Sequence, residues 1–343
     1  MGLNNNMEGQ FTGLIDDPRT PLEKLKDYKH EETVFSLAMG SPVVWEEKTK
    51  DQWKKYSTRN QDGSTSCVAQ ASAKALEVFL KNVYSATPIY NNRANYPQKG
   101  MWMGDAGDIL RKLGTKLESE VKSQLINDEQ MEALGKTFTD TQKIFSYITI
   151  NEKNFDGIVQ QIANGNPVLL ITHCRYDEYT DIPEYKGGQA ELGHCICATD
   201  YTLYQGKKYI VIDESWGHGI SMFDDKRLIS EDFLKARIDG AMYFVITDST
   251  PKPEKPHHVF NSNLVYGDKN EEVKWLQKVL VYEGFLKPIF ITGYFGDITF
   301  STVRKWQESH YEEILKPAGI KQGNASGKVL NYSRTYLNKI YGV

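Results

Sequence analysis

The feature that most constrains the fold of this chain is the proline-rich stretch "DSTPKPEKPHHVF" at residues 248–260. Its three prolines alternate with charged residues, and such a segment forms a stiff, extended spacer that cannot pack a core. A chain of 343 residues is also longer than one typical domain. The sequence therefore predicts a domain at residues 42–248, a linker at 249–256 and a smaller domain at 257–343.

The N-terminal residues 1–41 have a different character, because they are polar and irregular apart from a charged helix candidate at 21–32. We interpret them as an arm or pro-like extension that either docks to a particle or masks a cleft of the larger domain. The first thirty residues lack the basic-then-apolar order of a secretory signal. We therefore expect a protein that is made in the cytoplasm and would reach the outside of a cell by a route other than its own signal peptide.

The composition argues against several classes of function. An apolar content of 40% and a charged content of 25% are ordinary for a globular protein with a core. The formal net charge of -4 argues against a general binder of nucleic acid or of anionic membranes. No apolar run approaches the length of a membrane span, so we expect none.

Helical and strand signals in the larger domain are segregated along the chain. Apolar residues at helical spacing mark three segments, at 67–82, 107–114 and 154–165. Runs rich in β-branched and aromatic residues lie later, at 166–174, 193–201, 207–215 and 241–248. Helices first and strands afterwards indicate an α+β fold rather than alternating βαβ units.

The four cysteines, Cys67, Cys174, Cys195 and Cys197, have spacings that suit neither a disulfide framework nor a paired CxxC zinc site. Cys195 and Cys197 lie two apart in a strand candidate, so alternation places both thiols on one face and His194 on the other. We therefore expect no metal and no other cofactor. Reduced thiols suit folding in a cytosol.

One stretch has the composition of a nucleophilic site. "QDGSTSCVAQASAKALE" runs from Gln61 through a polar turn to Cys67 and then at once into an alanine-rich helix. A helix N-terminus stabilises a thiolate through its unpaired N–H groups and its macrodipole. The thiolate also needs a basic imidazole and a group that orients it, for which His194 and Glu214 are candidates. The structural alternatives are an inert core thiol, a core histidine and a solvated carboxylate.

Four separated segments, in order, resemble the papain-like cysteine peptidases, and especially their bacterial and phage branches. Gln61 stands six residues before Cys67, as the oxyanion glutamine of the family stands before its nucleophile, and the helix "CVAQASAKALE" follows. "NPV" at 166–168 is similar to the Gly-Pro-Val strand start of the family, "LGHCICATDY" to its His-Ala-Val strand, and "VIDESWGHG" to its Asn-Ser-Trp-Gly segment. The resemblance covers about residues 42–247 and implies a two-lobed domain, with a helical lobe and an antiparallel β lobe.

The resemblance also implies a role for each matching residue. Cys67 would attack a carbonyl carbon, and His194 would form an ion pair with the thiolate and later protonate the leaving amine. Gln61 and the backbone N–H of Cys67 would form the oxyanion hole. Trp216, which follows Ser215, would shield the hydrogen bond of the imidazole from water.

Three positions depart from the family pattern. Glu214 occupies the asparagine position, where a carboxylate can also orient an imidazole. Ser64 replaces a disulfide cysteine, and Val68 replaces an aromatic residue after the nucleophile. The order of segments places "KGMWMGD" at 99–105 on the wall of the substrate cleft.

The smaller domain contains a weak internal repeat. "GDKNEEVKWLQ" at 267–277 and "GDITFSTVRKWQ" at 296–307 each run from Gly-Asp through a turn into a Val-x-x-x-Gln helix. These segments resemble the peptidoglycan-binding domain of cell-wall hydrolases, a small three-helix fold whose third helix would lie at 333–341. In that fold we expect Trp275, Phe295 and Trp306 to build the core, with Tyr294 and Asp297 as candidate ligand contacts.

Together these features predict a papain-like thiol hydrolase that cleaves peptide bonds and is targeted to the bacterial cell wall, as a phage virion-associated or lysis protein. Its expected partners are a peptide or protein substrate, peptidoglycan, and other phage structural proteins through residues 1–41. One alternative is an endopeptidase that cuts peptidoglycan cross-bridges. The other is a catalytically idle papain-like protein with a structural or binding role in a phage particle, idle because of Glu214.

Overall fold

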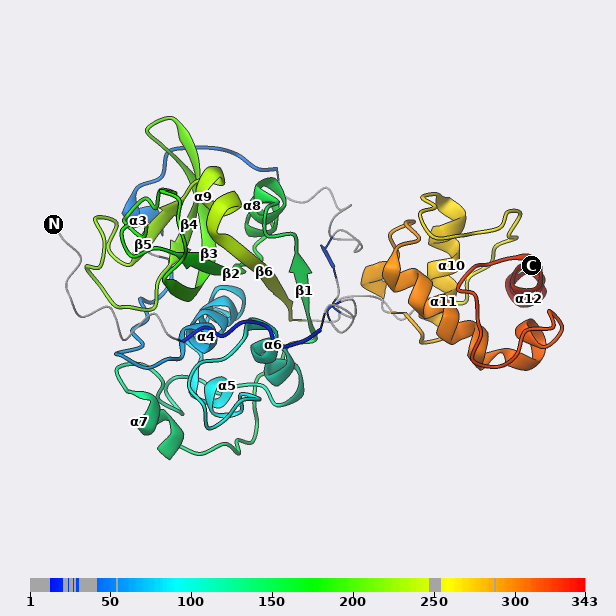
Figure 1. Cartoon of the computed structure of the whole chain (residues 1–343), viewed down its shortest axis with the longest axis horizontal. Coiled ribbons are helices and arrows are strands. Elements are labelled where there is room, and N and C mark those ends of the chain that lie inside the picture. Colours follow the sequence, from blue (N-terminus) through cyan, green and yellow to red (C-terminus); the bar gives the residue numbers. More distant parts are fainter. Residues whose placement is uncertain are drawn as a thin grey trace. The chain divides into compact units, whose positions relative to one another are not determined.

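The computed structural model divides the chain into two compact units, one of residues 1–19 and 39–248 and one of residues 20–38 and 249–343. Figure 1 shows the chain coloured along its sequence. The structure describes residues 13–20, 24, 27, 29, 30, 42–53, 55–246, 254–286 and 288–342. The helix candidate at 21–32 and the linker at 249–256 lie largely outside the described residues.

A six-stranded antiparallel sheet forms the β lobe of the larger unit. Its strands, in the order in which they pair, are β1 (Ser146–Ile150), β6 (Ile238–Val245), β2 (Val168–Cys174), β3 (Leu192–Tyr204), β4 (Lys207–Asp213) and β5 (Lys226–Ile229). β3 pairs with β2 on one side and β4 on the other, which places His194 opposite Thr172. The sheet therefore presents the start of β3 beside the end of β2.

The helical lobe comes from residues that precede the sheet. After the short α3 (Lys50–Trp53), it contains α4 (Cys67–Leu80), α5 (Thr87–Asn91), α6 (Met103–Lys112) and α7 (Asp128–Ala133). Two more helices, α8 (Phe155–Ala163) and α9 (Glu231–Arg237), pack on the sheet. Figure 1 shows α4 and α8 on different sides of the sheet. A helical lobe followed by an antiparallel β lobe confirms the predicted α+β fold.

The main core of the larger unit lies between α4 and the sheet. Its apolar side chains come from α4, α5 and α6 and from β2, β3 and β6. Cys195 and Cys197 both belong to this core, so their thiols share one face of β3, as strand alternation predicts. Because nearly every residue of α4 is buried, the position of its first residue is fixed by packing along the whole helix.

The smaller unit contains three principal helices, α10 (Glu271–Tyr282), α11 (Asp297–Ser309) and α12 (Asn331–Tyr341). A 3-10 turn at Pro288–Phe290 and a π-helical turn at Tyr311–Leu315 connect them. Among the described residues of the whole chain, no helix is both long enough and apolar enough to span a membrane.

The internal repeat of the smaller unit has a structural basis in two buried glutamines. Gln277 of α10 accepts a hydrogen bond from the Thr292 N–H at 2.8 Å and donates one to the Tyr294 carbonyl at 2.9 Å. Gln307 of α11 accepts from the Gly327 N–H at 3.0 Å and donates to a carbonyl of the same loop at 2.7 Å. Each side chain therefore satisfies backbone groups of the loop that follows its helix.

The aromatic residues of the smaller unit differ in one case from the expectation. Phe295 and Trp306 are fully buried, as predicted. Trp275 is only partly buried: it stacks on His258 with ring centroids 5.1 Å apart, and the Lys278 ammonium lies 3.7 Å from its ring centroid. The prediction that Trp275 builds the core is wrong because position 275 lies beside the buried stripe of α10, not on it.

Candidate active site

Cys67 is the first residue of α4, which places its thiol at the positive end of a 14-residue helix. The N–H groups of a first helical turn have no acceptors within the helix, and together with the macrodipole they stabilise negative charge. No acidic side chain in the first turn of α4 opposes this effect. The position therefore favours the thiolate, which is the nucleophilic form of cysteine.

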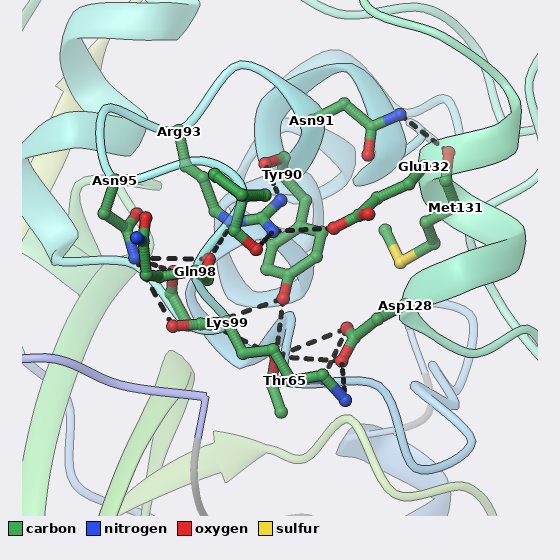
Figure 2. A network of polar contacts seen from close by, with 12 residues as sticks. Thr65, Tyr90, Asn91, Arg93, Asn95, Gln98, Lys99, Asp128, Met131 and Glu132 are labelled. Carbon is green, nitrogen blue, oxygen red and sulfur yellow. Dashed lines mark hydrogen bonds and ion pairs between the residues drawn. The ribbon is translucent and has the colours of Figure 1, made fainter.

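A polar network fixes the turn that leads into α4 (Figure 2). The Thr65 N–H donates to Oδ1 of Asp128 at 2.9 Å, and the hydroxyls of Thr65 and Tyr90 hydrogen-bond at 2.5 Å. The Gly100 N–H donates to the Thr65 hydroxyl at 3.2 Å. The network therefore ties the backbone before the nucleophile candidate to the segment 99–105, which the sequence places on the cleft wall.

His194 lies near the start of β3, and Cys67 is one of the groups that raise the pKa of its imidazole. Its Nε2 lies 3.0 Å from Oε2 of Glu214, so the carboxylate engages one of the two ring nitrogens. The Trp216 indole stacks on the imidazole, with ring centroids 4.4 Å apart and planes inclined by 18°. The imidazole is therefore held between a thiol and a carboxylate, under an aromatic ring that covers it.

Glu214 follows β4 and is fully buried, and each of its carboxylate oxygens accepts a hydrogen bond. The Tyr179 hydroxyl donates to Oε1 at 2.5 Å, and Nε of Arg227 donates to the same oxygen at 3.0 Å. His194 occupies the second oxygen. The alternative of a solvated carboxylate is therefore wrong.

The pKa shifts in this cluster favour charged forms. Burial acts to lower the pKa of His194, but the neighbouring Cys67 and Glu214 outweigh burial and raise it to about 9. Burial acts to raise the pKa of Glu214, but the hydrogen bond and charge of His194 and the charge of Arg227 hold it below its usual value. An imidazolium beside the thiol and a carboxylate behind the imidazolium follow at neutral pH.

Gln61 and Ser215 hold each other beside the start of α4. The Gln61 N–H donates to the Ser215 carbonyl at 2.7 Å, and the Ser215 hydroxyl donates to Oε1 of Gln61 at 2.6 Å. Nε2 of Gln61 donates to the Ser64 carbonyl at 2.8 Å. These bonds place the glutamine amide in the turn that precedes the Cys67 N–H, where the sequence predicts an oxyanion hole.

The structure thus brings together every site residue predicted from the sequence: Cys67, His194, Glu214, Gln61, Trp216 and Ser215. They come from the start of α4, from β3 and from the loop after β4, and the folding of the two lobes joins them. The remaining cysteines take no part in the site. Burial raises the pKa of Cys174 to about 12 and those of Cys195 and Cys197 well above their usual values.

The N-terminal segment lies directly over Cys67. A Cβ atom placed on Gly13 would lie 2.5 Å from the Thr65 carbonyl oxygen and 2.9 Å from Sγ of Cys67, so only glycine fits there. The segment pairs in parallel with the cleft wall: the Met101 N–H donates to the Gly13 carbonyl at 3.0 Å, and the Ile15 N–H donates to the Met101 carbonyl at 3.2 Å. The thiol is fully buried as a result.

Side chains of the same segment make three further contacts. Leu14 packs against the main core, and Oδ1 of Asp16 lies 3.7 Å from Nε2 of His173. The Arg19 guanidinium lies 4.4 Å from the ring centroid of Trp102, within reach of a cation–π interaction. The described part of the N-terminal arm therefore covers the Cys67 thiol in this structure.

Within the described part of the chain, no group of three or more His, Cys, Asp and Glu side chains could hold a metal ion. Three residues of the site were missed by sequence reasoning. Arg227 had a weak signal, because Lys226 and Arg227 are a charged pair directly before the apolar Leu228 and Ile229. Gly13 lies in a short apolar patch, "FTGLI", within a polar arm, whereas Tyr179 has no signal in its neighbours.

The smaller unit matches a known sequence family. Residues 269–311 match the family described as "Putative peptidoglycan binding domain". The match lies within the domain that the sequence predicts to be peptidoglycan-binding. No curated protein sequence matches the chain.

The larger unit is similar to solved structures of cysteine proteases. Xylellain, a cysteine protease from Xylella fastidiosa, superposes with a TM-score of 0.54 at 18% identity, over 70% of this chain and 97% of that chain. Digestive procathepsin L2 from the larval midgut of Tenebrio molitor gives 0.55 at 18% identity, over 70% and 79%. The ragweed pollen allergen Amb a 11, a cysteine protease in its proform, gives 0.53 at 15% identity, over 71% and 78%.

At these identities the likeness concerns the fold. The order of a helical lobe, a cysteine at the start of its main helix and an antiparallel sheet that carries a histidine is the arrangement described above. The chain therefore combines the fold of the papain-like cysteine proteases with a C-terminal segment, residues 269–311, that matches the putative peptidoglycan-binding family.

Proposed function

We propose that this protein is a cysteine peptidase that hydrolyses peptide bonds through Cys67 and His194. The observation that carries the proposal is the buried chain of contacts from the N-terminus of α4 through His194 to Glu214. A thiol at a helix start, a protonated imidazole against it and a carboxylate that orients the imidazole are the groups that nucleophilic catalysis by cysteine needs.

The chemistry follows from these positions. The Cys67 thiolate attacks the carbonyl carbon, and the oxyanion accepts hydrogen bonds from the Gln61 amide and the Cys67 N–H. The His194 imidazolium gives its proton to the leaving amine, which leaves an acyl thioester on the sulfur. The neutral imidazole then takes a proton from water, whose oxygen attacks the thioester and releases the acid and the thiolate.

We place the reaction at the bacterial cell wall. The match of residues 269–311 to a peptidoglycan-binding family supports this location. A tether raises the effective concentration of the catalytic unit at a surface that the other unit binds. An isolated fragment of residues 257–343 is expected to sediment with purified sacculi, and a fragment that stays in the supernatant would contradict the wall-binding part of the proposal.

Covalent labelling of the full chain tests the peptidase proposal. An epoxide inhibitor of cysteine proteases should add one equivalent to the protein, as measured by intact mass. Because Gly13 covers the thiol, the Gly13→Ala variant is treated in parallel with the wild type. Cys67→Ala should gain no mass, and Cys174→Ala should be labelled like its parent, since burial keeps that thiol unreactive. If neither the Gly13→Ala variant nor the wild type gains an adduct, the proposal is refuted.

A second candidate function is a catalytically idle structural or binding protein of a phage particle. The complete burial of Cys67 under the N-terminal segment favours it, because a covered thiol cannot meet a substrate. Deleting residues 1–41 separates the two: the peptidase proposal requires the deletion to raise the labelling of Cys67. Unchanged labelling together with loss of the protein from phage particles would support the second candidate.

The substrate is proposed to be a protein or peptide, with peptidoglycan cross-bridges as the alternative. Release of amino groups from an unfolded protein and from purified sacculi, measured with the Gly13→Ala variant, decides between them. The proposed role as a virion-associated or lysis protein is supported by the wall-binding match and by four cysteines that are all free. Mass spectrometry of purified phage particles tests the virion role. If the chain is absent from the particles, the virion role is excluded and the role as a lysis protein remains.

A further inference from the structure

We propose that Arg227 is a positioning residue of the catalytic site, which neutralises the buried Glu214 carboxylate and so lets it serve as the partner of His194. The inference rests on the proposed peptidase function and adds a residue to it. Its basis is geometric: three donors share two carboxylate oxygens, and each donor is nearly or fully buried.

The two oxygens of Glu214 have separate tasks. Oε2 lies 3.0 Å from Nε2 of His194, while Oε1 accepts from Nε of Arg227 at 3.0 Å and from the Tyr179 hydroxyl at 2.5 Å. Burial and the Glu214 charge raise the pKa of Tyr179 well above its usual value, so its hydroxyl keeps the proton that it donates. One oxygen is thus held rigidly and the other is directed at the imidazole.

Charge balance gives Arg227 its function. A carboxylate taken out of water without a counter-charge is costly. The guanidinium offsets the negative charge of Glu214, so the pair is neutral as a whole. The imidazole then meets an oxygen acceptor in a neutral setting, as it would meet an amide at position 214. The thiolate and imidazolium of the reacting pair remain balanced by each other.

The sheet fixes the position of Arg227. β5 pairs with β4 so that Arg227 lies opposite Ile212 and Lys226 lies opposite Asp213. Two adjacent cations of β5 therefore meet two adjacent carboxylates at the end of β4: Nζ of Lys226 lies 2.6 Å from Asp213, and Nε of Arg227 lies 3.0 Å from Glu214. This double pairing sets the register in which the guanidinium reaches the catalytic carboxylate.

Aromatic contacts connect the guanidinium to the imidazole as well. The Cζ of Arg227 lies 4.7 Å from the ring centroid of Tyr179 and 5.8 Å from that of Trp216, the ring that stacks on His194. The titratable groups that face this cluster are Cys67 from α4, Cys174 from β2, Tyr179, and Asp181, whose Oδ1 lies 3.9 Å from Nη1 of Arg227. Apart from the His194 imidazolium itself, Arg227 is the cation that contacts Glu214 among the described residues.

The test measures the protonation of His194 directly, by NMR of the full chain with isotope-labelled histidine. The His194 resonance is assigned from a His194→Gln variant among the seven histidines. Arg227→Met leaves the carboxylate uncompensated, so the His194 midpoint should rise by about one pH unit. Glu214→Gln leaves the guanidinium uncompensated, so the midpoint should fall by about one unit.

Two further variants control for misfolding. Arg227→Lys keeps the charge and should keep the midpoint near that of the wild type. The double variant Glu214→Gln/Arg227→Met removes both charges and should return the midpoint toward the wild-type value from that of Glu214→Gln alone. If Arg227→Met fails to fold, the return of the His194 midpoint in the double variant is sufficient to test the proposal. Equal midpoints in Glu214→Gln and the double variant, or shifts of the same sign in both single variants, would overturn the proposal.

This outcome is separate from that of the peptidase proposal. Labelling of Cys67 by an epoxide reports whether the thiol is a nucleophile, whereas the His194 midpoints report only on the charges around the imidazole. A labelled wild type with unmoved midpoints would refute the role of Arg227 and leave the peptidase intact. An unlabelled protein whose midpoints shift in opposite directions would refute the peptidase proposal and leave the role of Arg227 intact.

Discussion

Replacing Gly13 by alanine should expose the nucleophile. The added Cβ would lie 2.5 Å from the Thr65 carbonyl oxygen and 2.9 Å from Sγ of Cys67, so one of these groups must move. The Thr65 backbone is held by its hydrogen bond to Asp128, and Cys67 is fixed as the first residue of a buried helix. The N-terminal segment is the partner that gives way, because two backbone hydrogen bonds and three side-chain contacts hold it, whereas Cys67 is held by a whole buried helix.

The size of the effect follows from those contacts. Two backbone hydrogen bonds pair the segment with Met101, each worth about 1 kcal/mol. A methyl group forced into a packed site costs about 1–3 kcal/mol. That cost falls on the covered state only, and each 1.4 kcal/mol is a factor of about ten in a population. The uncovered fraction should therefore rise about 5- to 150-fold.

The assay is the rate at which iodoacetamide alkylates Cys67 at fixed pH, followed by intact mass. When the segment opens and closes faster than the thiol reacts, this rate is proportional to the uncovered fraction. The control is Gly206→Ala, in the hairpin between β3 and β4, where an added Cβ meets no atom within 4 Å and the positive φ of 75° places the strain away from Cys67. An equal rate in Gly13→Ala and the wild type would refute the idea that this segment covers the nucleophile.

Three other perturbations have defined outcomes. Removing the oxyanion donor in Gln61→Ala should lower the turnover of the Gly13→Ala protein about 100- to 1000-fold. Hydrolysis should fall as the pH rises through about 9, because His194 there loses the proton that the leaving amine needs. The raised pKa of His194 also stabilises the folded protein: this contribution is present below pH 6.5 and is lost toward pH 9, which urea titrations would detect. Gln277→Leu should destabilise residues 257–343 by about 1–3 kcal/mol in urea unfolding, because it leaves buried backbone groups unpaired.

The sequence predicted the parts of the fold that depend on local pattern. The helix expected at 67–82 is observed at 67–80, and the four strands expected from β-branched runs are β2, β3, β4 and β6. The strands that escaped prediction are β1 and β5, at the two edges of the sheet. β5 contains the buried charges Lys226 and Arg227, and a charged pair in a four-residue segment gives the pattern of a loop until its partners are known.

The candidate site was predictable where a residue's role depends on its own neighbours in sequence. Cys67 precedes a helix, and Trp216 follows a strand end, so each could be found from a short segment. Gly13 could not, because its role comes from a contact with a residue 54 positions away (67 - 13 = 54), and the same glycine in a solvated arm would have no function.

Glu214 shows the same limit of sequence reasoning, because the alternative of a solvated carboxylate was wrong. Considered without its partners, a carboxylate at an asparagine position is either buried, where its charge is too costly, or solvated, where nothing holds it in place. The structure contains a third possibility, because a guanidinium thirteen residues later (227 - 214 = 13) removes the excess charge without removing the acceptor. The effect of the substitution at 214 on catalysis is therefore a property of the pair. If Glu214→Asn were made without changing Arg227, it would leave a buried cation next to an imidazolium, and we expect it to weaken the enzyme even though it restores the usual side chain.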